Sequence, residues 1–223
     1  MRPLVILRPE PGASQTAEQA QRLGLTPMVM PLSAIEAQPW TAPVEDAFDG
    51  LLITSANAVR FGGPELQKLE GLPVYAVGEA TADTAREAGF AVEKVGSGGV
   101  DSLLSQIAPQ SRLLHLCGVH RRVPKNAVQQ IEPIVVYCSV ERDLPGNLKQ
   151  FEGAVVAVHS PRAGERLDGL YLEESVDRSA TTVVAISEDA ARPAGQGWQQ
   201  VEVASEPNDA ALLALAARLC QNV

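Results

Sequence analysis

The chain has 223 residues, of which 45% are hydrophobic, 20% charged and 4% aromatic. This composition is typical of a folded globular protein and excludes a disordered, collagen-like or membrane-embedded chain. The 18 Lys and Arg against 27 Asp and Glu give a net charge of −9, so no broad positive field attracts nucleic acid or an anionic membrane surface. Any anionic ligand must therefore be held by local donors. The length allows either one large α/β domain or two small ones.

The cysteines and the N-terminal segment indicate where the protein works. Cys117, Cys138 and Cys220 have no CxxC spacing and form no zinc-ligand pattern with the histidines. The apolar run near the N-terminus stops at Arg8, too early for a signal-peptide core, and no uncharged stretch reaches the roughly 18 apolar residues of a membrane span. We expect a cytoplasmic protein with reduced cysteines and no bound metal.

Short apolar runs recur along the chain, separated in most places by segments of helical length. Continuous Val, Ile, Leu and Ala runs are typical of parallel strands buried on both faces, with helices in the connections. Ser55 and Asp101 are predicted helix N-caps, while Gly24 and Gly89 are predicted to follow helix C-termini. The predicted strands are 4–7, 28–30, 51–53, 74–77, 92–95, 113–116, 134–136, 155–158, 183–186 and 201–203.

The chain also matches itself at an offset of 109 residues. Residues 74–79 lie over 183–188, and 4–7 lie over 113–116. One copy runs complete from about 38 to 134, whereas the other becomes complete only when the two N-terminal strands are added to its three C-terminal ones. The repeat therefore predicts one α/β domain inserted into another.

The predicted domains are a discontinuous one, residues 1–35 plus 140–223, and an inserted one, residues 38–134. The chain must cross between them at 32–37 and 135–140, and both crossings carry β-prone residues that can pair as a two-stranded ribbon. Ligands of open parallel sheets lie outside the carboxyl ends of the strands, so a ligand in an interdomain cleft would meet the loop after each strand.

Small hydroxyl, amide and glycine residues fill those loops. Such residues leave helix N-terminal N–H groups uncovered, and these groups bind carboxylates, although ordinary N-capping or a simple turn is the alternative for each loop. Arg8 emerges directly from the first strand and suits carboxylate recognition, against the alternative of a surface salt bridge. Tyr137 lies in the second crossing. Its side chain is expected either to pack in the hinge or to face the cleft and act as a proton donor. No familiar catalytic constellation is present, so an enzyme of this sequence would act by holding its substrate.

Six motifs together match a known family, over nearly the whole chain. They are Arg8-Pro9, Ile53-Thr54-Ser55-Ala56-Asn57-Ala58-Val59, Val77-Gly78-Glu79-Ala80-Thr81-Ala82, Leu116-Cys117-Gly118, Val136-Tyr137 and Ser160-Pro161. In this order they resemble uroporphyrinogen-III synthase. The resemblance implies two flavodoxin-like parallel-sheet α/β domains, one inserted in the other, joined by a two-stranded β-ribbon with an interdomain cleft.

The resemblance also implies a hydro-lyase of tetrapyrrole and haem biosynthesis that acts as a monomer. Its substrate would be hydroxymethylbilane, a linear tetrapyrrole with an acetate and a propionate on every ring. The substrate loses its hydroxyl as water and closes, by way of a spiro intermediate, to uroporphyrinogen III with ring D inverted. No metal or organic cofactor, nucleic acid or membrane is involved. Because the bilane closes spontaneously to the symmetrical isomer, catalysis would lie in positioning and water exclusion.

Residue roles are carried over by position. Tyr137 would assist departure of the hydroxyl. Ser55, Asn57, Thr81 and Ser160 would bind substrate carboxylates with nearby backbone N–H groups. The full set of candidate substrate-binding residues is Arg8, Thr54, Ser55, Asn57, Gly78, Thr81, Gly118, Ser160 and Ser187.

Several positions depart from the family pattern. Ala190 replaces a common threonine, and His159 replaces a hydroxyl residue. Glu188 and Asp189 are expected to cap the N-terminus of the following helix, where its dipole favours acids. Two other functions remain open: a two-lobed small-molecule binding or sensor protein, and an inactive homologue of the synthase.

Overall fold

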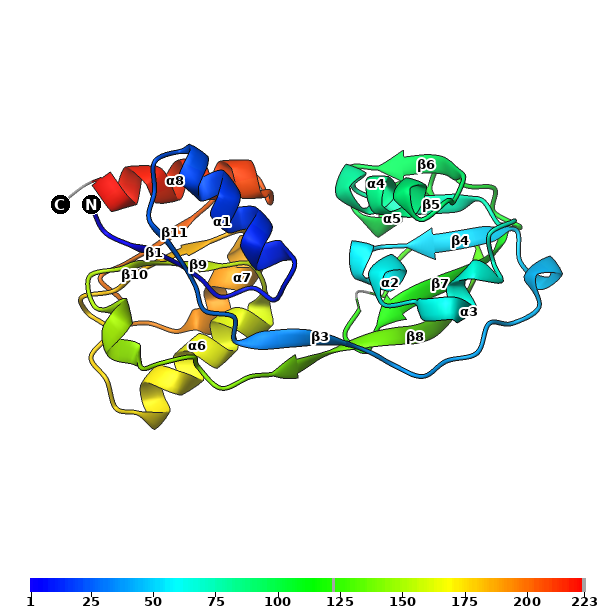
Figure 1. The fold of residues 1–223 in the computed structure, drawn as a ribbon. Helices are drawn as coiled ribbons and strands as arrows, with labels where there is room; N and C mark the ends of the chain where they lie inside the picture. Colours follow the sequence, from blue (N-terminus) through cyan, green and yellow to red (C-terminus); the bar gives the residue numbers. More distant parts are fainter. Residues whose placement is uncertain (122, 222–223) are drawn as a thin grey trace. The chain divides into compact units, whose positions relative to one another are not determined.

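The computed structural model describes residues 1–121 and 123–221, so Arg122 and the last two residues of the predicted discontinuous domain lie outside it. The chain divides into two compact units, Met1–Ala34 with Glu141–Val223 and Ile35–Val140 (Figure 1). We call them the first and the second unit. Each is built on a largely parallel sheet, which confirms the predicted α/β class with two parallel-sheet domains.

The sheet of the first unit is assembled from both ends of the chain. Its strand order is β11-β10-β9-β1-β2, and every pair in it is parallel. The strands are β1 (Leu4–Ile6), β2 (Pro27–Val29), β9 (Val155–Val158), β10 (Thr182–Ala185) and β11 (Gln200–Val203). Because β1 pairs with β9, the unit cannot form until the C-terminal half of the chain has joined the N-terminal strands.

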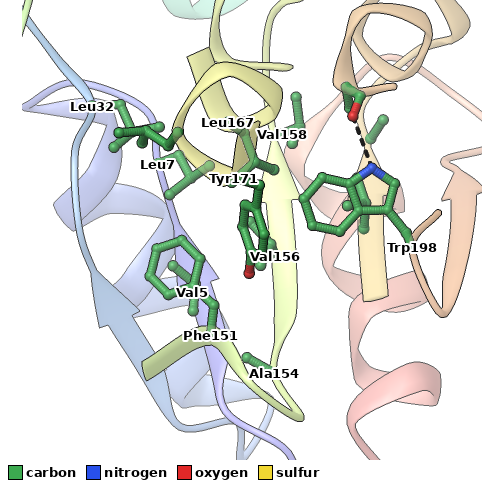
Figure 2. Close-up of a cluster of buried hydrophobic side chains, with 14 of the residues drawn as sticks. Val5, Leu7, Leu32, Phe151, Ala154, Val156, Val158, Leu167, Tyr171 and Trp198 are labelled. Atoms are coloured by element: carbon green, nitrogen blue, oxygen red, sulfur yellow. Dashed lines mark hydrogen bonds between the residues drawn. The ribbon is translucent and has the colours of Figure 1, made fainter. Parts of the chain in front are cut away.

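Helices cover both faces of this sheet, and alternate strand residues enter the two cores. Leu4 and Ile6 pack with the small and aliphatic residues of α1 and α8, whereas Val5 and Leu7 pack in the other core. Figure 2 shows that second core, where Tyr171 and Trp198 meet edge to face and Trp198 Nε1 donates to the Ala194 carbonyl at 2.8 Å. The helices are α1 (Gly12–Arg22), α6 (Pro161–Glu173), α7 (Glu188–Ala191) and α8 (Asp209–Gln221), with 3-10 turns η2 (Leu148–Phe151) and η3 (Arg192–Ala194).

The sheet of the second unit has the order β3-β8-β7-β4-β5-β6. The strands from β8 to β6 are parallel. They are β3 (Ser33–Ala37), β4 (Gly50–Ile53), β5 (Val74–Val77), β6 (Val92–Gly96), β7 (Arg112–Gly118) and β8 (Gln130–Glu141). The helices are α2 (Ala56–Arg60), α3 (Gly63–Gln67), α4 (Glu79–Glu87) and α5 (Val100–Leu104), with the 3-10 turn η1 (Glu45–Ala47).

The two chain crossings pair with each other. Gln38 N donates to Val136 O and Arg142 N donates to Leu32 O, both at 2.9 Å. Later residues of the first crossing thus pair with earlier residues of the second, so β3 runs antiparallel to β8. Strand β8 extends from 130 to 141, well beyond the predicted 134–136, because it continues from the sheet into this ribbon.

The strand orders of the two sheets agree with the 109-residue repeat. Strands β11, β10, β9, β1 and β2 occupy the places that β6, β5, β4, β7 and β8 occupy in the second unit. Gly24 and Gly89 follow helix C-termini with φ of 75° and 93°, as predicted. The Asp101 prediction is wrong: Gly99 is the N-cap of α5, and Asp101 lies in the first turn, where its carboxylate accepts from the N–H groups of Lys125 and Asn126.

Candidate functional site

The carboxyl edge of the second sheet brings three of the predicted loops together, because β7, β4 and β5 are neighbours. Ser55 is the N-cap of α2, and its Oγ accepts from Asn57 N at 3.3 Å. Thr54 Oγ1 lies 3.2 Å from His115 Nε2. Burial, and then the charge of Arg121, lower the pKa of His115 to about 4, so the imidazole is neutral near pH 7. Thr54 is thus held by an uncharged partner.

Helix α4 begins without a side-chain cap. Its N-cap is Gly78, with φ of 83°, a backbone conformation that residues with a Cβ rarely adopt. Thr81, in the first turn, is buried, and its N–H returns to Gly78 O at 3.1 Å. In the part of the chain that the structure describes, no side chain caps this terminus. The first turn of α4 therefore presents N–H groups and a positive dipole end to an external acceptor.

A β-bulge places Tyr137 across Gly118. Cys117 is paired with Val135, but Gly118 is paired with Tyr137, so β8 has one extra residue at this point. A Cβ on Gly118 would lie 2.7 Å from Cε2 and Cζ of Tyr137 and 3.1 Å from its hydroxyl oxygen. Glycine therefore leaves the space that the phenol ring occupies at the end of β7. The Tyr137 ring is partly exposed.

The carboxyl edge of the first sheet carries capped helices. Ser160 caps α6 by accepting from Ala163 N at 3.2 Å, and Ser187 caps α7 by accepting from Ala190 N at 3.4 Å. Both hydroxyls accept in these bonds, so each keeps its proton for another acceptor. Glu188 and Asp189 lie in the first turn of α7, but the prediction that they cap this helix is wrong, because the N-cap is Ser187.

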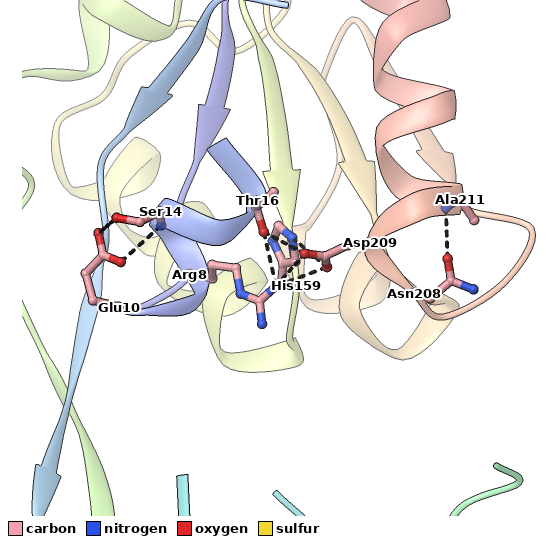
Figure 3. A network of polar contacts seen from close by, with 8 residues as sticks. All are labelled: Arg8, Glu10, Ser14, Thr16, His159, Asn208, Asp209 and Ala211. Carbon is pink, nitrogen blue, oxygen red and sulfur yellow. Dashed lines mark hydrogen bonds and ion pairs between the residues drawn. The ribbon is translucent and has the colours of Figure 1, made fainter. Parts of the chain in front are cut away.

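Arg8 lies at the end of β1 in a polar network (Figure 3). Its Nη1 donates to both carboxylate oxygens of Asp209, at 3.0 and 2.9 Å, and to Thr16 Oγ1 at 3.2 Å. The Thr16 hydroxyl donates to Asp209 Oδ2 at 2.6 Å. The carboxylate that Arg8 binds in the structure is therefore the chain's own.

His159 completes this network from the end of β9. Its side chain is 6% exposed, and Nε2 lies 3.5 Å from Asp209 Oδ1. Neither ring nitrogen has a hydrogen bond of good geometry within residues 1–121 and 123–221. Burial, followed by the nearby charge of Arg8, lowers the pKa of His159. The imidazole is therefore neutral at physiological pH, as is that of His115 in the second unit.

Each unit thus collects its own predicted residues at one sheet edge. The second unit has the Thr54 to Asn57 loop, the Gly78 to Thr81 turn, Gly118 and Tyr137, and the first unit has Arg8, Ser160 and Ser187. The residues that surround Arg8 were not among those predicted from the sequence; they are Asp209, Thr16 and Gly12. Asp209 is 201 residues from Arg8, and no local pattern signals a pair at that separation.

Two further observations bear on the class of protein. Among the described residues, no three His, Cys, Asp or Glu side chains are grouped so as to hold a metal ion. In the same residues, no helix has the length and apolarity needed to cross a membrane. With small residues, hydroxyls and open N–H groups at sheet edges, the fold defines a two-unit α/β protein whose loops suit anionic groups.

Comparison with known proteins makes this class specific. Residues 14–214 match the sequence profile of the family described as uroporphyrinogen-III synthase HemD, and the chain belongs to this family. It is similar in structure to uroporphyrinogen-III synthetase from Helicobacter pylori 26695, with a TM-score of 0.64 and 20% identity over 98% of this chain and 100% of that one. A mutant uroporphyrinogen III synthase from the extremely thermophilic bacterium Thermus thermophilus gives a TM-score of 0.54 and 20% identity over 99% and 100% of the two chains. No curated protein matches the sequence.

Proposed function

We propose that the chain is an active uroporphyrinogen-III synthase, which cyclises hydroxymethylbilane to uroporphyrinogen III with loss of water and inversion of ring D. The observation that carries the proposal is that Tyr137 and the uncapped N-terminus of α4 belong to the same sheet edge, in a member of this family. The bulge and Gly118 hold the phenol ring at the end of β7, at the carboxyl edge of the second sheet where the loops after β4 and β5 also begin.

Substrate binding would use the N–H groups of α4 together with the hydroxyls at the sheet edges. Each acetate or propionate is a carboxylate, and the positive end of a helix stabilises such a group by about 0.3–1 kcal/mol at an exposed site. The net charge of −9 does not oppose this, because short-range donors rather than a long-range field select the anion. The role of these residues is to fold one flexible bilane into one geometry.

The chemical step needs little more than a proton and a dry site. The Tyr137 hydroxyl would donate its proton as the terminal hydroxyl of the bilane leaves as water. A positioned general acid contributes about 10²–10⁴-fold, and orientation of the reacting ends contributes the rest. In this scheme the neutral His115 fixes Thr54 without placing a second charge beside the substrate.

The decisive experiment gives freshly prepared hydroxymethylbilane to the purified protein and resolves the oxidised product isomers. The proposal expects the type III isomer, formed faster than the bilane closes without protein. Formation of the type I isomer alone, at the spontaneous rate, would contradict it and leave an inactive homologue or a binding protein. A reaction without protein and a Tyr137→Phe reaction are the matched controls.

A further inference from the structure

The guanidinium of Arg8 is anchored through one of its two terminal nitrogens. All of its hydrogen bonds to Asp209 and Thr16 come from Nη1. Figure 3 shows the other terminal nitrogen pointing away from Asp209 and Thr16. A guanidinium has five N–H donors in a fixed planar fork, so the ion pair with Asp209 leaves Nη2 with two donors.

The backbone of α1 is shaped to receive this side chain. A Cβ on Gly12 would lie 2.6 Å from Arg8 Nε, 2.8 Å from Cζ and 2.9 Å from Nη2. Glycine therefore lets the guanidinium lie against the first turn of the helix. The Arg8 side chain is 31% exposed and that of Asp209 is 22% exposed, so the pair is partly shielded but still reached by solvent. Such a held side chain loses little conformational entropy when it binds a ligand.

The remaining neighbours do not occupy the outward nitrogen. Glu10 is the other acid drawn in Figure 3. Its carboxylate is bound to Ser14, accepting from Ser14 N at 3.0 Å and from Ser14 Oγ at 2.9 Å. His159 adds no charge near pH 7, and its buried ring nitrogens make no hydrogen bond of good geometry among the described residues. The local arrangement is thus a guanidinium fixed by one carboxylate with donors left for a second.

We propose that Nη2 of Arg8 binds a carboxylate of the ligand, and that Asp209 and Gly12 act as positioning residues for it. The ligand class is a polycarboxylate. This assignment rests on the proposed function and deepens it, because it names the group of the first unit that holds one substrate carboxylate. Asp209 is then a fixed counter-ion rather than a competitor that the ligand must displace.

The effect of removing Asp209 on ligand affinity distinguishes a positioning role from a competing one. If Asp209 competes with the ligand for the guanidinium, its removal frees Arg8 and tightens binding. If Asp209 orients Arg8, its removal weakens binding. Asp168 supplies a matched control, because it forms another Arg–Asp pair, with Arg178, in the same unit.

The experiment measures the Kd of uroporphyrin III, a stable octacarboxylate, by fluorescence or calorimetry. Because a hydrogen bond to a charged group is worth about 1.5–3 kcal/mol, Arg8→Met is expected to raise Kd by roughly 10- to 100-fold. Arg8→Lys should lie between Arg8→Met and the unaltered protein. Asp209→Asn and Gly12→Ala should raise Kd by a smaller factor, and Asp168→Asn should leave it unchanged. Circular dichroism and thermal unfolding of each variant check that it is folded.

A double variant separates positioning from general loss of structure. Asp209→Asn should have no further effect on Kd in an Arg8→Met background, because the residue acts through Arg8. Tighter binding by Asp209→Asn, unaltered binding by folded Arg8→Met or Arg8→Lys, or no binding of uroporphyrin III by the unaltered protein would each overturn the assignment.

The isomer assay distinguishes a failure of the Arg8 assignment from a failure of the proposed synthase activity. Arg8-dependent binding without formation of the type III isomer would leave the assignment standing and remove the synthase activity. Formation of the type III isomer by Arg8→Met with the KM of the unaltered protein would remove the assignment and leave the activity.

Discussion

The two units share one sheet order but differ in what stands at the carboxyl edge. In the second unit the turn before α4 is made by Gly78 and leaves backbone N–H groups uncapped, while the end of β7 is made by Gly118, which is buried against Tyr137. In the first unit the corresponding edge carries Arg8, His159 and Asp209 in one network. The same sheet order thus presents backbone donors in the second unit and charged side chains in the first.

Helix capping makes the same distinction. In the first unit, the N-terminus of α1 is satisfied by Glu10, that of α8 by Asn208, whose Oδ1 accepts from Ala211 N at 2.9 Å, and those of α6 and α7 by serines. In the second unit Ser55 caps α2, but α4 and α5 begin at Gly78 and Gly99 without a side-chain cap. A duplicated strand order therefore fixes where a site lies, whereas a few loop residues decide which chemical groups the site offers.

Substitution of Tyr137 is expected to have the largest effect, and to act on kcat rather than on KM. Tyr137→Phe removes the only proposed proton donor and should lower kcat by about 10²-fold, with stability unchanged because the ring packing is retained. Arg8→Met, in the other unit, should act mainly on KM. Steady-state kinetics on fresh hydroxymethylbilane measures both. An unaltered kcat for Tyr137→Phe would remove Tyr137 from the mechanism.

The next effect tests whether the backbone of the second unit positions the phenol. Gly118→Ala places a methyl group where the Tyr137 ring now lies, so the ring must move and kcat should fall toward the value of Tyr137→Phe. In a Tyr137→Phe background the same substitution should lower kcat little further. Gly169→Ala is the matched glycine-to-alanine control, because its added Cβ meets only a side-chain oxygen at 3.9 Å and should leave kcat unchanged. A Gly118→Ala variant with the kcat of the unaltered protein would show that the glycine does not position the ring.

The buried histidines provide a pH test that reads both units. Burial is the main cause that lowers the pKa of His115, to about 4, and of His159, from the usual 6.5. Below pH 6.5 these two histidines are protonated in the unfolded chain but stay neutral in the folded chain. The free energy of unfolding should therefore fall as the pH decreases from 7 toward 5. Urea unfolding across this range measures the slope.

Single variants assign that slope to one unit or the other. His115→Gln and His159→Gln should each flatten the pH dependence, because each removes one group that is neutral when folded and charged when unfolded. A free energy of unfolding that stays constant between pH 7 and pH 5 in the unaltered protein would show that the rings accept protons in the folded state.

The smallest expected effect concerns the capped helices of the first unit. Ser160→Ala removes the acceptor for Ala163 N and should lower the free energy of unfolding by about 1 kcal/mol. Ser160→Thr keeps the oxygen and should recover most of this loss. Equal stability of Ser160→Ala and the unaltered protein in urea unfolding would mean that water replaces the cap.

Much of the fold was predictable because its signals are local or repeated. Continuous apolar runs predicted all the strands of the two sheets apart from β3, which lies in the first crossing that was expected to be β-prone. Ser55 and the glycines after α1 and α4 were predicted from short-range capping chemistry. Asp101 was assigned wrongly, because Gly99 supplies the φ of 88° at the start of α5 and the acid then lies inside the first turn.

The strand pattern, the internal repeat and the loop residues that resemble the family can all be read from the amino-acid sequence alone. Three contacts become visible only in the folded chain: Arg8 pairs with Asp209, 201 residues away, a bulge places Tyr137 against Gly118, and His159 lies beside the ion pair. The physical reason is that periodicity and capping depend on neighbours in the chain. Ion pairs, bulges and buried imidazoles depend on which strands become neighbours in space, and here β1 and β9 meet from opposite ends of the sequence.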